Sequence, residues 1–139
     1  MRFMIIVKAT KDSEAGVMPP EKLLAEMGKY HEELQKAGVL LDGNGLQASS
    51  KGFKVKYTGS KRAITDGPCA AKDLIAGYTM IQTKTREEAR QWALRFPNPT
   101  IDGSDTEVEV RQVFELEDFG PSQAVDRMKD MNVGKKKGK

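Results

Sequence analysis

The order of strand and helix patterns is the feature that most constrains the fold of this chain. A strand pattern, a helix pattern and a second strand pattern follow one another twice, with a predicted β-hairpin inserted between the two units. Each helix pattern has one apolar face, so we expect both helices to cover the same face of one sheet. This order, βαββαβ with an inserted β-hairpin, predicts an α+β fold of the ferredoxin-like sandwich type.

The first unit begins with residues Arg2–Ala9, whose apolar side chains alternate onto both faces of the predicted strand. Such a strand is covered on both sides and belongs in the centre of a sheet. The following helix starts at Pro19 and Pro20 and runs to about Ala37, before Gly38. The residues that share its apolar face are Leu23, Leu24, Met27, Tyr30, His31 and Leu34.

The segment between the units is rich in turn signals. The residues Asp42-Gly43-Asn44-Gly45 are typical of a turn. The stretches Phe53–Thr58 and Arg62–Thr65 predict a β-hairpin. A tight Asp-Gly-Pro turn at 66–68 then leads into a strand at Ala76–Thr83. In the hairpin, one buried face is indicated by apolar residues that alternate with lysines: Phe53, Val55 and Tyr57.

The second unit contains the best-defined helix. Thr85 and Glu88 predict a capping box, in which each side chain accepts a hydrogen bond from a free backbone N–H. Pro97 ends the helix, whose apolar face carries Ala89, Trp92, Ala93 and Phe96. Residues Glu107–Leu116 then alternate as a strand, with Arg111 on the face opposite to Val108, Val110, Phe114 and Leu116. A short helix is expected over 122–131.

A sheet with both helices on one face leaves its other face uncovered. Right-handed crossovers would place the first and last long strands side by side in the centre of the sheet. The uncovered face is apolar on the first strand and carries Val113 among charged groups on the last strand. Because exposed apolar faces usually bind a partner, we predict a homodimer that packs through the open sheet face.

Length and composition fit one soluble domain. The chain has 139 residues, of which we assign 1–131 to a single domain and 132–139 to a basic C-terminal tail. No apolar run approaches the roughly 20 residues of a membrane span. One cysteine, Cys69, cannot form an internal disulfide, and no secretion-signal pattern is present, so a cytoplasmic location is the expectation.

Much of the net charge of +3 comes from the tail, in which four lysines follow Gly134. A basic tail could contact nucleic acid or an acidic membrane surface. No aromatic residue interleaves with these lysines, so they provide no platform for stacked bases. We therefore expect a solvated tail, with neither a nucleic acid nor a membrane as partner.

Four separated blocks of the chain carry a resemblance to a known family. They are YHEELQKAGVLLDGNGLQ at 30–47, TDGP with KDLIAGYTMIQ within 65–82, EEARQWALRFP at 87–97 and EVEVRQVFELEDFGP at 107–121. Together these blocks resemble the YCII-related family, in the subgroup called DGPF-domain proteins. The resemblance implies a dimeric α+β barrel built from ferredoxin-like subunits. Members are mostly small bacterial proteins of unassigned activity. Some are thought to be enzymes with a His–Asp pair, and some are encoded beside sigma factors of the extracytoplasmic type.

The chain departs from the family pattern at two points. The pattern reads Asp-Gly-Pro-Phe, and Cys69 stands where the phenylalanine would be. The segment that follows is one residue short and lacks its first glutamate. If that glutamate takes part in the chemistry, this protein has altered or lost it. The residues that still match are Asp66, Gly67, Pro68, Lys72 and Asp73.

The only histidine, His31, is the candidate for acid/base catalysis. A histidine ordinarily titrates near pH 6.5, which suits proton transfer at neutral pH, and His31 matches the family's histidine in the first helix. Asp66 could orient the imidazole and raise its basicity, or act as a base itself. The alternative is structural: His31 is partly buried with both ring nitrogens satisfied, and Asp66 caps N–H groups of its turn.

Arg111 and Tyr78 are the candidate substrate-binding residues. Arg111 could bind a carboxylate through two hydrogen bonds, or it could form a salt bridge to Glu107, Glu109 or an acid of a partner chain. Tyr78 could donate a hydrogen bond into a pocket or serve only in packing. Asp42 is a further acid, which we interpret as structural because it lies in a predicted turn.

Metals and cofactors are not predicted. One histidine and one cysteine cannot supply a zinc tetrad, and no carboxylate spacing matches a calcium loop. No glycine-rich phosphate loop follows a strand. Cys69 lies in no signature of an activated thiol, so we interpret it as a small apolar replacement for a larger residue.

Two functions follow from these residues and the resemblance. The first is a cofactor-independent enzyme acting on a small organic molecule by isomerase or lyase-type chemistry. In it His31 is the proton shuttle, Asp66 orients His31, and Arg111 or Tyr78 anchors the substrate. The second is a non-catalytic ligand-binding or regulatory dimer linked to sigma-factor-type transcription control. The distance between His31 and Asp66 should help to separate them.

Overall fold

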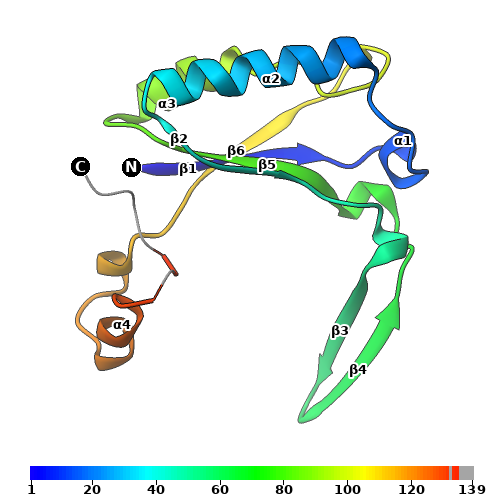
Figure 1. The fold of residues 1–139 in the computed structure, drawn as a ribbon. Helices are drawn as coiled ribbons and strands as arrows, with labels where there is room; N and C mark the ends of the chain where they lie inside the picture. The colour runs from blue at the N-terminus through cyan, green and yellow to red at the C-terminus, as the bar shows by residue number, and fades with distance from the viewer. Residues whose placement is uncertain (132, 135–139) are drawn as a thin grey trace.

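The computed structural model describes residues 1–131 and 133–134 and contains a four-stranded antiparallel sheet with two helices on one face (Figure 1). Both helices, α2 (Glu21–Lys36) and α3 (Arg86–Leu94), lie above the sheet in that view. The predicted α+β class is confirmed. Of the predicted basic tail at 132–139, residues 132 and 135–139 lie outside the described residues. The strands, in their order across the sheet, are β2 (Leu40–Gly45), β5 (Ile75–Gln82), β1 (Arg2–Lys8) and β6 (Val108–Gln112).

Strand β1 is central, as its two apolar faces predict. It pairs antiparallel with β5 on one side and β6 on the other, so Met4 lies opposite both Met80 and Arg111. The first and last strands are neighbours, as expected, but β6 is an edge strand. The expectation that both are central was wrong, because β5 occupies the other central position.

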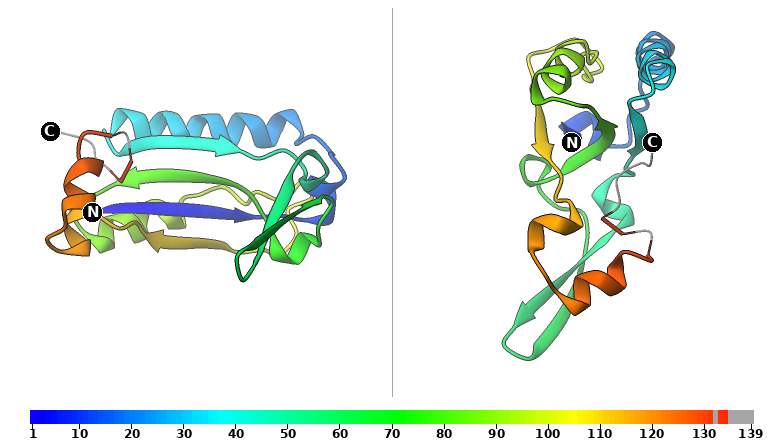
Figure 2. Two further views of the ribbon diagram at one scale, coloured as in Figure 1. Left: turned by 90° about the horizontal axis from the view of Figure 1, so that it is seen from below. Right: turned by 90° about the vertical axis from the view of Figure 1, so that its left-hand side faces the viewer.

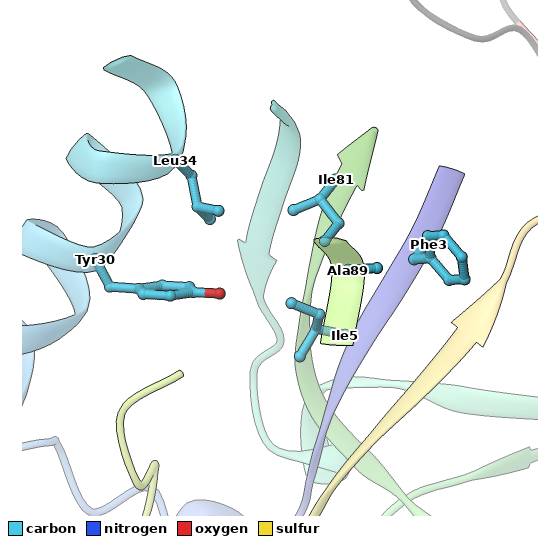
Figure 3. Packing of buried hydrophobic residues seen from close by; sticks show 6 residues of the cluster. All are labelled: Phe3, Ile5, Tyr30, Leu34, Ile81 and Ala89. Carbon is cyan, nitrogen blue, oxygen red and sulfur yellow. The ribbon is translucent and has the colours of Figure 1, made fainter. Parts of the chain in front are cut away.

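The hydrophobic core lies between the sheet and the two helices (Figure 3). Ile5, Leu34 and Ile81 are completely buried there. The hydroxyl of Tyr30 in α2 donates a hydrogen bond to the carbonyl of Trp92 in α3 at 2.7 Å, which ties the two helices together. The predicted apolar faces of both helices therefore meet on this side of the sheet.

Strand β2 occupies a segment for which we predicted a turn. Residues 42–45 pair with β5, and Asn44 lies opposite Tyr78. The carboxylate of Asp42 accepts the N–H of Gly43 at 2.9 Å, a turn-like local bond that the strand accommodates. The turn prediction was wrong because hydrogen bonding to β5 overrides local preference.

Two helices begin with side-chain caps. A short helix, α1 (Lys11–Glu14), follows β1, and Thr10 caps it. At α3, the hydroxyl of Thr85 accepts the N–H of Glu88 at 3.1 Å, as predicted. The Glu88 carboxylate accepts the N–H of Lys84 at 3.1 Å, one residue before the cap that we predicted.

The predicted hairpin forms from β3 (Phe53–Thr58) and β4 (Lys61–Asp66), between the short 3-10 helices η1 (Ser49–Lys51) and η2 (Ala71–Asp73). It projects from the open side of the sheet (Figure 1), and among the described residues its two strands pair only with each other. The expectation of a buried face was therefore wrong within one chain. Its apolar residues are exposed: Phe53, Val55, Tyr57 and Ile64.

The last strand is shorter than predicted. The ladder ends after Val113, whose N–H donates to the carbonyl of Arg2, and the chain then turns away from the sheet. Leu116 is buried in the 3-10 helix η3 (Leu116–Phe119), not on a strand face. The predicted short C-terminal helix is α4 (Gln123–Met128). In the part of the chain described, no helix is long and apolar enough to span a membrane.

Candidate functional site

Helix α2 holds His31 against the central strand β5. Its Nδ1 atom lies 2.7 Å from the carbonyl oxygen of Met27, one helical turn earlier. Its Nε2 atom lies 2.8 Å from the hydroxyl of Thr79. Because a carbonyl can only accept, Nδ1 carries the proton of the neutral ring. In that state Nε2 is the acceptor, and the Thr79 hydroxyl donates to it.

The ring of His31 is bordered by aromatic rings and by bare backbone. Tyr30 and Phe96 meet it edge to face, with centroids at 5.6 Å and 6.4 Å. On the side of β2 its neighbour is Gly43, where an added Cβ would lie 3.5 Å from Nε2. The glycine therefore places no side chain of β2 beside Nε2.

A cavity of about 460 Å³ opens beside His31, between α2 and the helix-covered face of the sheet. Its floor is residues 43–45 of β2 and 76–79 of β5. This volume lies in the range of small-molecule sites. Most of the remaining lining is apolar and comes from Val7, Pro19, Leu23, Leu24, Met27, Phe96 and Pro99.

A second cavity of about 420 Å³ adjoins the first and extends to α1 and the loop at 99–106. The two cavities share lining residues, so they form one groove along the end of the sheet. His31 and Thr79 lie in the first cavity only. The shared residues are Val7, Pro19, Gly45, Ala76 and Pro99.

Asp66 lies elsewhere, exposed at the end of β4 where the hairpin joins the body. Among the residues that the structure describes, no hydrogen bond or ion pair joins it to His31. The ring nitrogens of His31 are instead occupied by Met27 and Thr79. The structure therefore does not bring the expected His–Asp pair together within one chain.

The Asp-Gly-Pro-Cys stretch fastens the hairpin to the body. Gly67 packs so closely that an added Cβ would lie 1.8 Å from the carbonyl oxygen of Ser49. The N–H of Cys69 donates to the hydroxyl of Ser49 at 2.8 Å. The Ser49 hydroxyl in turn donates to the carboxylate of Glu14 in α1. This arrangement gives the glycine a packing role at the hairpin base.

Tyr78 projects from the face of β5 opposite to Thr79, because successive residues of a strand alternate. Its hydroxyl lies 3.3 Å from the carboxylate of Asp42 and accepts a hydrogen bond from the amide of Asn44 at 3.0 Å. Our interpretation of Asp42 as part of a turn was wrong, since it lies on β2 beside Tyr78. These three side chains form a polar cluster on the open face of the sheet.

Arg111 also lies on the open face, on the edge strand β6. It forms an exposed ion pair with Glu109 at 3.1 Å, the alternative that we considered beside substrate binding. Glu109 also accepts from the ammonium of Lys8 at 2.8 Å. Hydrogen bonds from Lys8 and then from Arg111 lower the pKa of the Glu109 carboxyl below its usual value.

The four predicted site residues thus occupy three places: His31 on the helix side, Asp66 at the hairpin base, and Tyr78 and Arg111 on the open face. The residue that sequence reasoning missed is Thr79. A threonine on the apolar face of a central strand needs a hydrogen-bond partner, and that requirement was the available signal. Within the described residues, no group of three His, Cys, Asp or Glu side chains is placed to hold a metal ion.

Comparisons with known proteins identify the family of this chain. No curated protein matches it significantly. Residues 1–117 match the model of the YCII-related domain. The match spans the whole four-stranded sheet, both covering helices and the His31 cavity. The chain therefore belongs to the YCII-related domain family.

Proposed function

We propose that this YCII-related protein is a cofactor-independent enzyme that moves a proton on a small, largely apolar molecule. His31 is the acid/base group of this proposal. The observation that supports it most is the position of the His31 Nε2 atom, beside a cavity of about 460 Å³ and 2.8 Å from the Thr79 hydroxyl. Isomerase or lyase-type chemistry fits, because one group that accepts and returns a proton is sufficient.

The hydrogen bonds of His31 suit a ring that gains and loses a proton. In the neutral ring, Nε2 accepts from Thr79 and Nδ1 donates to Met27. When a substrate gives a proton to the Thr79 oxygen and the hydroxyl passes its own proton to Nε2, the imidazolium donates to both oxygen atoms without moving, because a hydroxyl also accepts. Both protonation states therefore keep their partners, which supports a shuttle.

In this proposal the Met27 carbonyl orients His31, a role that we had expected of Asp66. A backbone carbonyl on Nδ1 fixes the tautomer as a carboxylate would, although it adds no negative charge. Asp66 then serves the turn at the hairpin base. Tyr78 and Arg111 stay candidates for binding a substrate that reaches the open face of the sheet.

The alternative proposal is a non-catalytic ligand-binding or regulatory dimer linked to sigma-factor-type transcription control. Two observations favour it: the cavity is lined mainly by apolar side chains, and Nε2 already has a partner in Thr79. A ligand would then bind by burying apolar surface and by hydrogen bonding to His31 or Thr79.

A metabolite-library thermal-shift screen followed by proton NMR of each hit tests both proposals. The variants are His31→Gln, which lacks the acid/base group, and Gly43→Ala, which places a methyl group 3.5 Å from Nε2. The control is Asp66→Asn. Hits should stabilise the wild type and the control, stabilise Gly43→Ala less, and be converted by all but His31→Gln.

The other outcomes of that screen are equally informative. Ligands that bind the cavity but stay unchanged in NMR would favour the non-catalytic alternative. Conversion that survives in His31→Gln would refute the proton shuttle. Conversion that disappears in Asp66→Asn, while the variant remains folded, would restore the His–Asp pair.

We further propose a cytoplasmic homodimer of the DGPF subgroup, packed through the open sheet face as a dimeric α+β barrel of ferredoxin-like subunits. The strand order β2-β5-β1-β6 and the position of both helices on one face support this. The open face carries the half-buried side chains of Met4, Ile6 and Met80. Light scattering at micromolar concentration should give a dimer for the wild type and for Val17→Lys, and a monomer for Ile6→Lys.

A further inference from the structure

The hairpin β3–β4 is an arm with an uncovered apolar face. Cross-strand pairing places Phe53, Val55, Tyr57 and Ile64 on one face, and Phe53 and Ile64 are 65% and 69% exposed. A two-stranded hairpin without a covered face is marginally stable in water. The arm thus carries more apolar surface than its own chain covers.

A second arm leaves the other end of the sheet. This C-terminal arm, residues 114–131, contains η3 and α4 and lies on the same open side as the hairpin (Figures 1 and 2). Phe114 and Phe119 stack at its base with ring centroids 4.9 Å apart, yet they are 64% and 58% exposed. The arm therefore also presents an apolar surface that its own chain leaves uncovered.

The two arms carry opposite charge. Residues 51–66 contain five basic side chains and one acidic side chain, whereas residues 115–130 contain five acidic and two basic ones. Within one chain the arms lie at opposite ends of the sheet, so they cannot pair with each other (Figure 2). A second copy of the chain offers each arm a surface of matching chemistry.

The open sheet face limits how two copies can meet, and this step rests on the homodimer proposed above. Two sheets that face each other are related by a two-fold axis lying between them. If that axis runs along the strands, each hairpin meets the other hairpin and like charges oppose. If it runs across the strands, the ends are exchanged and each hairpin meets the C-terminal arm of the other copy.

We infer that the two-fold axis runs across the strands and that each hairpin packs its apolar face on the Phe114–Phe119 stack of the second copy. The opposite charges of the two arms favour this orientation and increase the association rate. The aromatic and aliphatic side chains of the two arms form the contact. Each chain then covers the exposed apolar surface of its partner's arms at both ends of the interface.

Cysteine cross-linking with a short bis-maleimide tests the pairing. In a Cys69→Ser background, Val55→Cys labels the hairpin and Phe119→Cys labels the C-terminal arm. The double variant should yield cross-linked dimers on a denaturing gel, while each single variant should yield at least tenfold less. Because the arms of one chain lie at opposite ends of the sheet, an internal cross-link cannot mimic this result.

The outcomes separate this inference from the dimer itself. A cross-link in the Val55→Cys single variant would show hairpins meeting each other and would overturn the inference. A dimer by light scattering without any cross-link would also overturn it, yet would leave the open-face dimer intact. A monomeric Cys69→Ser parent would overturn both the arm pairing and the open-face dimer. If the double variant forms no cross-link and the protein binds a fluorescent oligonucleotide, the hairpin would be assigned to nucleic-acid binding instead.

Discussion

The two sides of the sheet differ in how far one chain completes them. On the helix-covered side, Ile5, Leu34 and Ile81 have no exposed surface, and Tyr30 has a hydrogen-bond partner for its hydroxyl. On the open side, large apolar side chains such as Phe53 and Phe114 stand in solvent on two projecting arms. The helix-covered side is therefore a core that one chain completes, whereas the open side leaves apolar surface exposed to solvent.

This difference indicates where stability and association reside. Burial of apolar surface is the main source of folding free energy, so the helix-covered side should dominate the stability of one chain. Exposed apolar patches of this kind mark interaction sites, so the open side should dominate association. Substitutions on the two sides should therefore differ in whether they change folding or association.

The largest loss is expected for Leu34→Ala on the helix-covered side. It removes a fully buried side chain and leaves a cavity between α2 and the sheet, which should cost about 4 kcal/mol of unfolding free energy. The matched control is Leu94→Ala, whose side chain is 79% exposed and should change stability by less than about 0.5 kcal/mol. Urea denaturation measures both, and equal losses would show that burial is not what makes Leu34 important for stability.

Arg2→Met should cost about 3 kcal/mol by releasing the C-terminal arm. Arg2 is 5% exposed, with bonds to the Glu115 carboxylate at 3.1 Å and to the carbonyl of Phe114 at 2.9 Å. Removal of the Arg2 guanidinium leaves the largely buried Glu115 carboxylate without this ion-pair partner. Urea denaturation should detect the loss, and amide hydrogen exchange should show faster exchange confined to residues 114–131.

The control for Arg2 is Lys8→Met, which breaks the more exposed ion pair with Glu109. Exposed pairs contribute at most about 1 kcal/mol. If Lys8→Met destabilises the chain as much as Arg2→Met, burial is not what makes the Arg2 bonds important.

Gly67→Ala should cost about 2 kcal/mol and loosen the hairpin arm. The added methyl group would lie 1.8 Å from the carbonyl oxygen of Ser49, so the backbone at the hairpin base must shift. The control is Gly45→Ala, where nothing lies within 4 Å of the added carbon. Proteolysis in β3 and β4 should accelerate only in Gly67→Ala. Equal rates in both variants would show that the contact between Gly67 and Ser49 does not hold the hairpin base.

Patterns that report burial within one chain were predictable from the sequence. Apolar spacing located both helices and three of the four sheet strands, β1, β5 and β6, because periodicity follows the face that the core covers. His31 was correctly placed on the apolar face of α2. The hydrogen bond of its Nε2 atom ends on Thr79, 48 residues away, and no local spacing predicts such a contact.

Features that depend on distant backbone were not predictable. The residues Asp42-Gly43-Asn44-Gly45 carry strong turn chemistry, yet β5 recruits them into a strand. Alternation in the hairpin correctly indicated an apolar face, but alternation does not say what covers that face. Asp66 was expected near His31 from the family resemblance, while the close contact of Gly67 with Ser49 holds its turn at the hairpin base.

Apart from the controls, Tyr30→Phe is expected to have the smallest effect at neutral pH. The hydroxyl of Tyr30 donates to the carbonyl of Trp92, which also accepts the N–H of Arg95 at 3.1 Å. The carbonyl therefore keeps one partner in the variant, and the loss should be about 1 kcal/mol. Urea denaturation at pH 7 provides this value.

In alkaline solution, Tyr30→Phe should instead flatten the pH dependence of stability. Burial raises the pKa of Tyr30 from 10.0 to about 12, with Arg95 lowering and Glu33 raising it to smaller extents. The folded chain therefore favours the neutral phenol more than the unfolded chain does. This stability is complete below pH 10 and is lost as pH rises from 10 to 12. Between those pH values the wild type should lose unfolding free energy more steeply than the variant, and parallel curves would show that the helix-covered side does not shield the phenol from water.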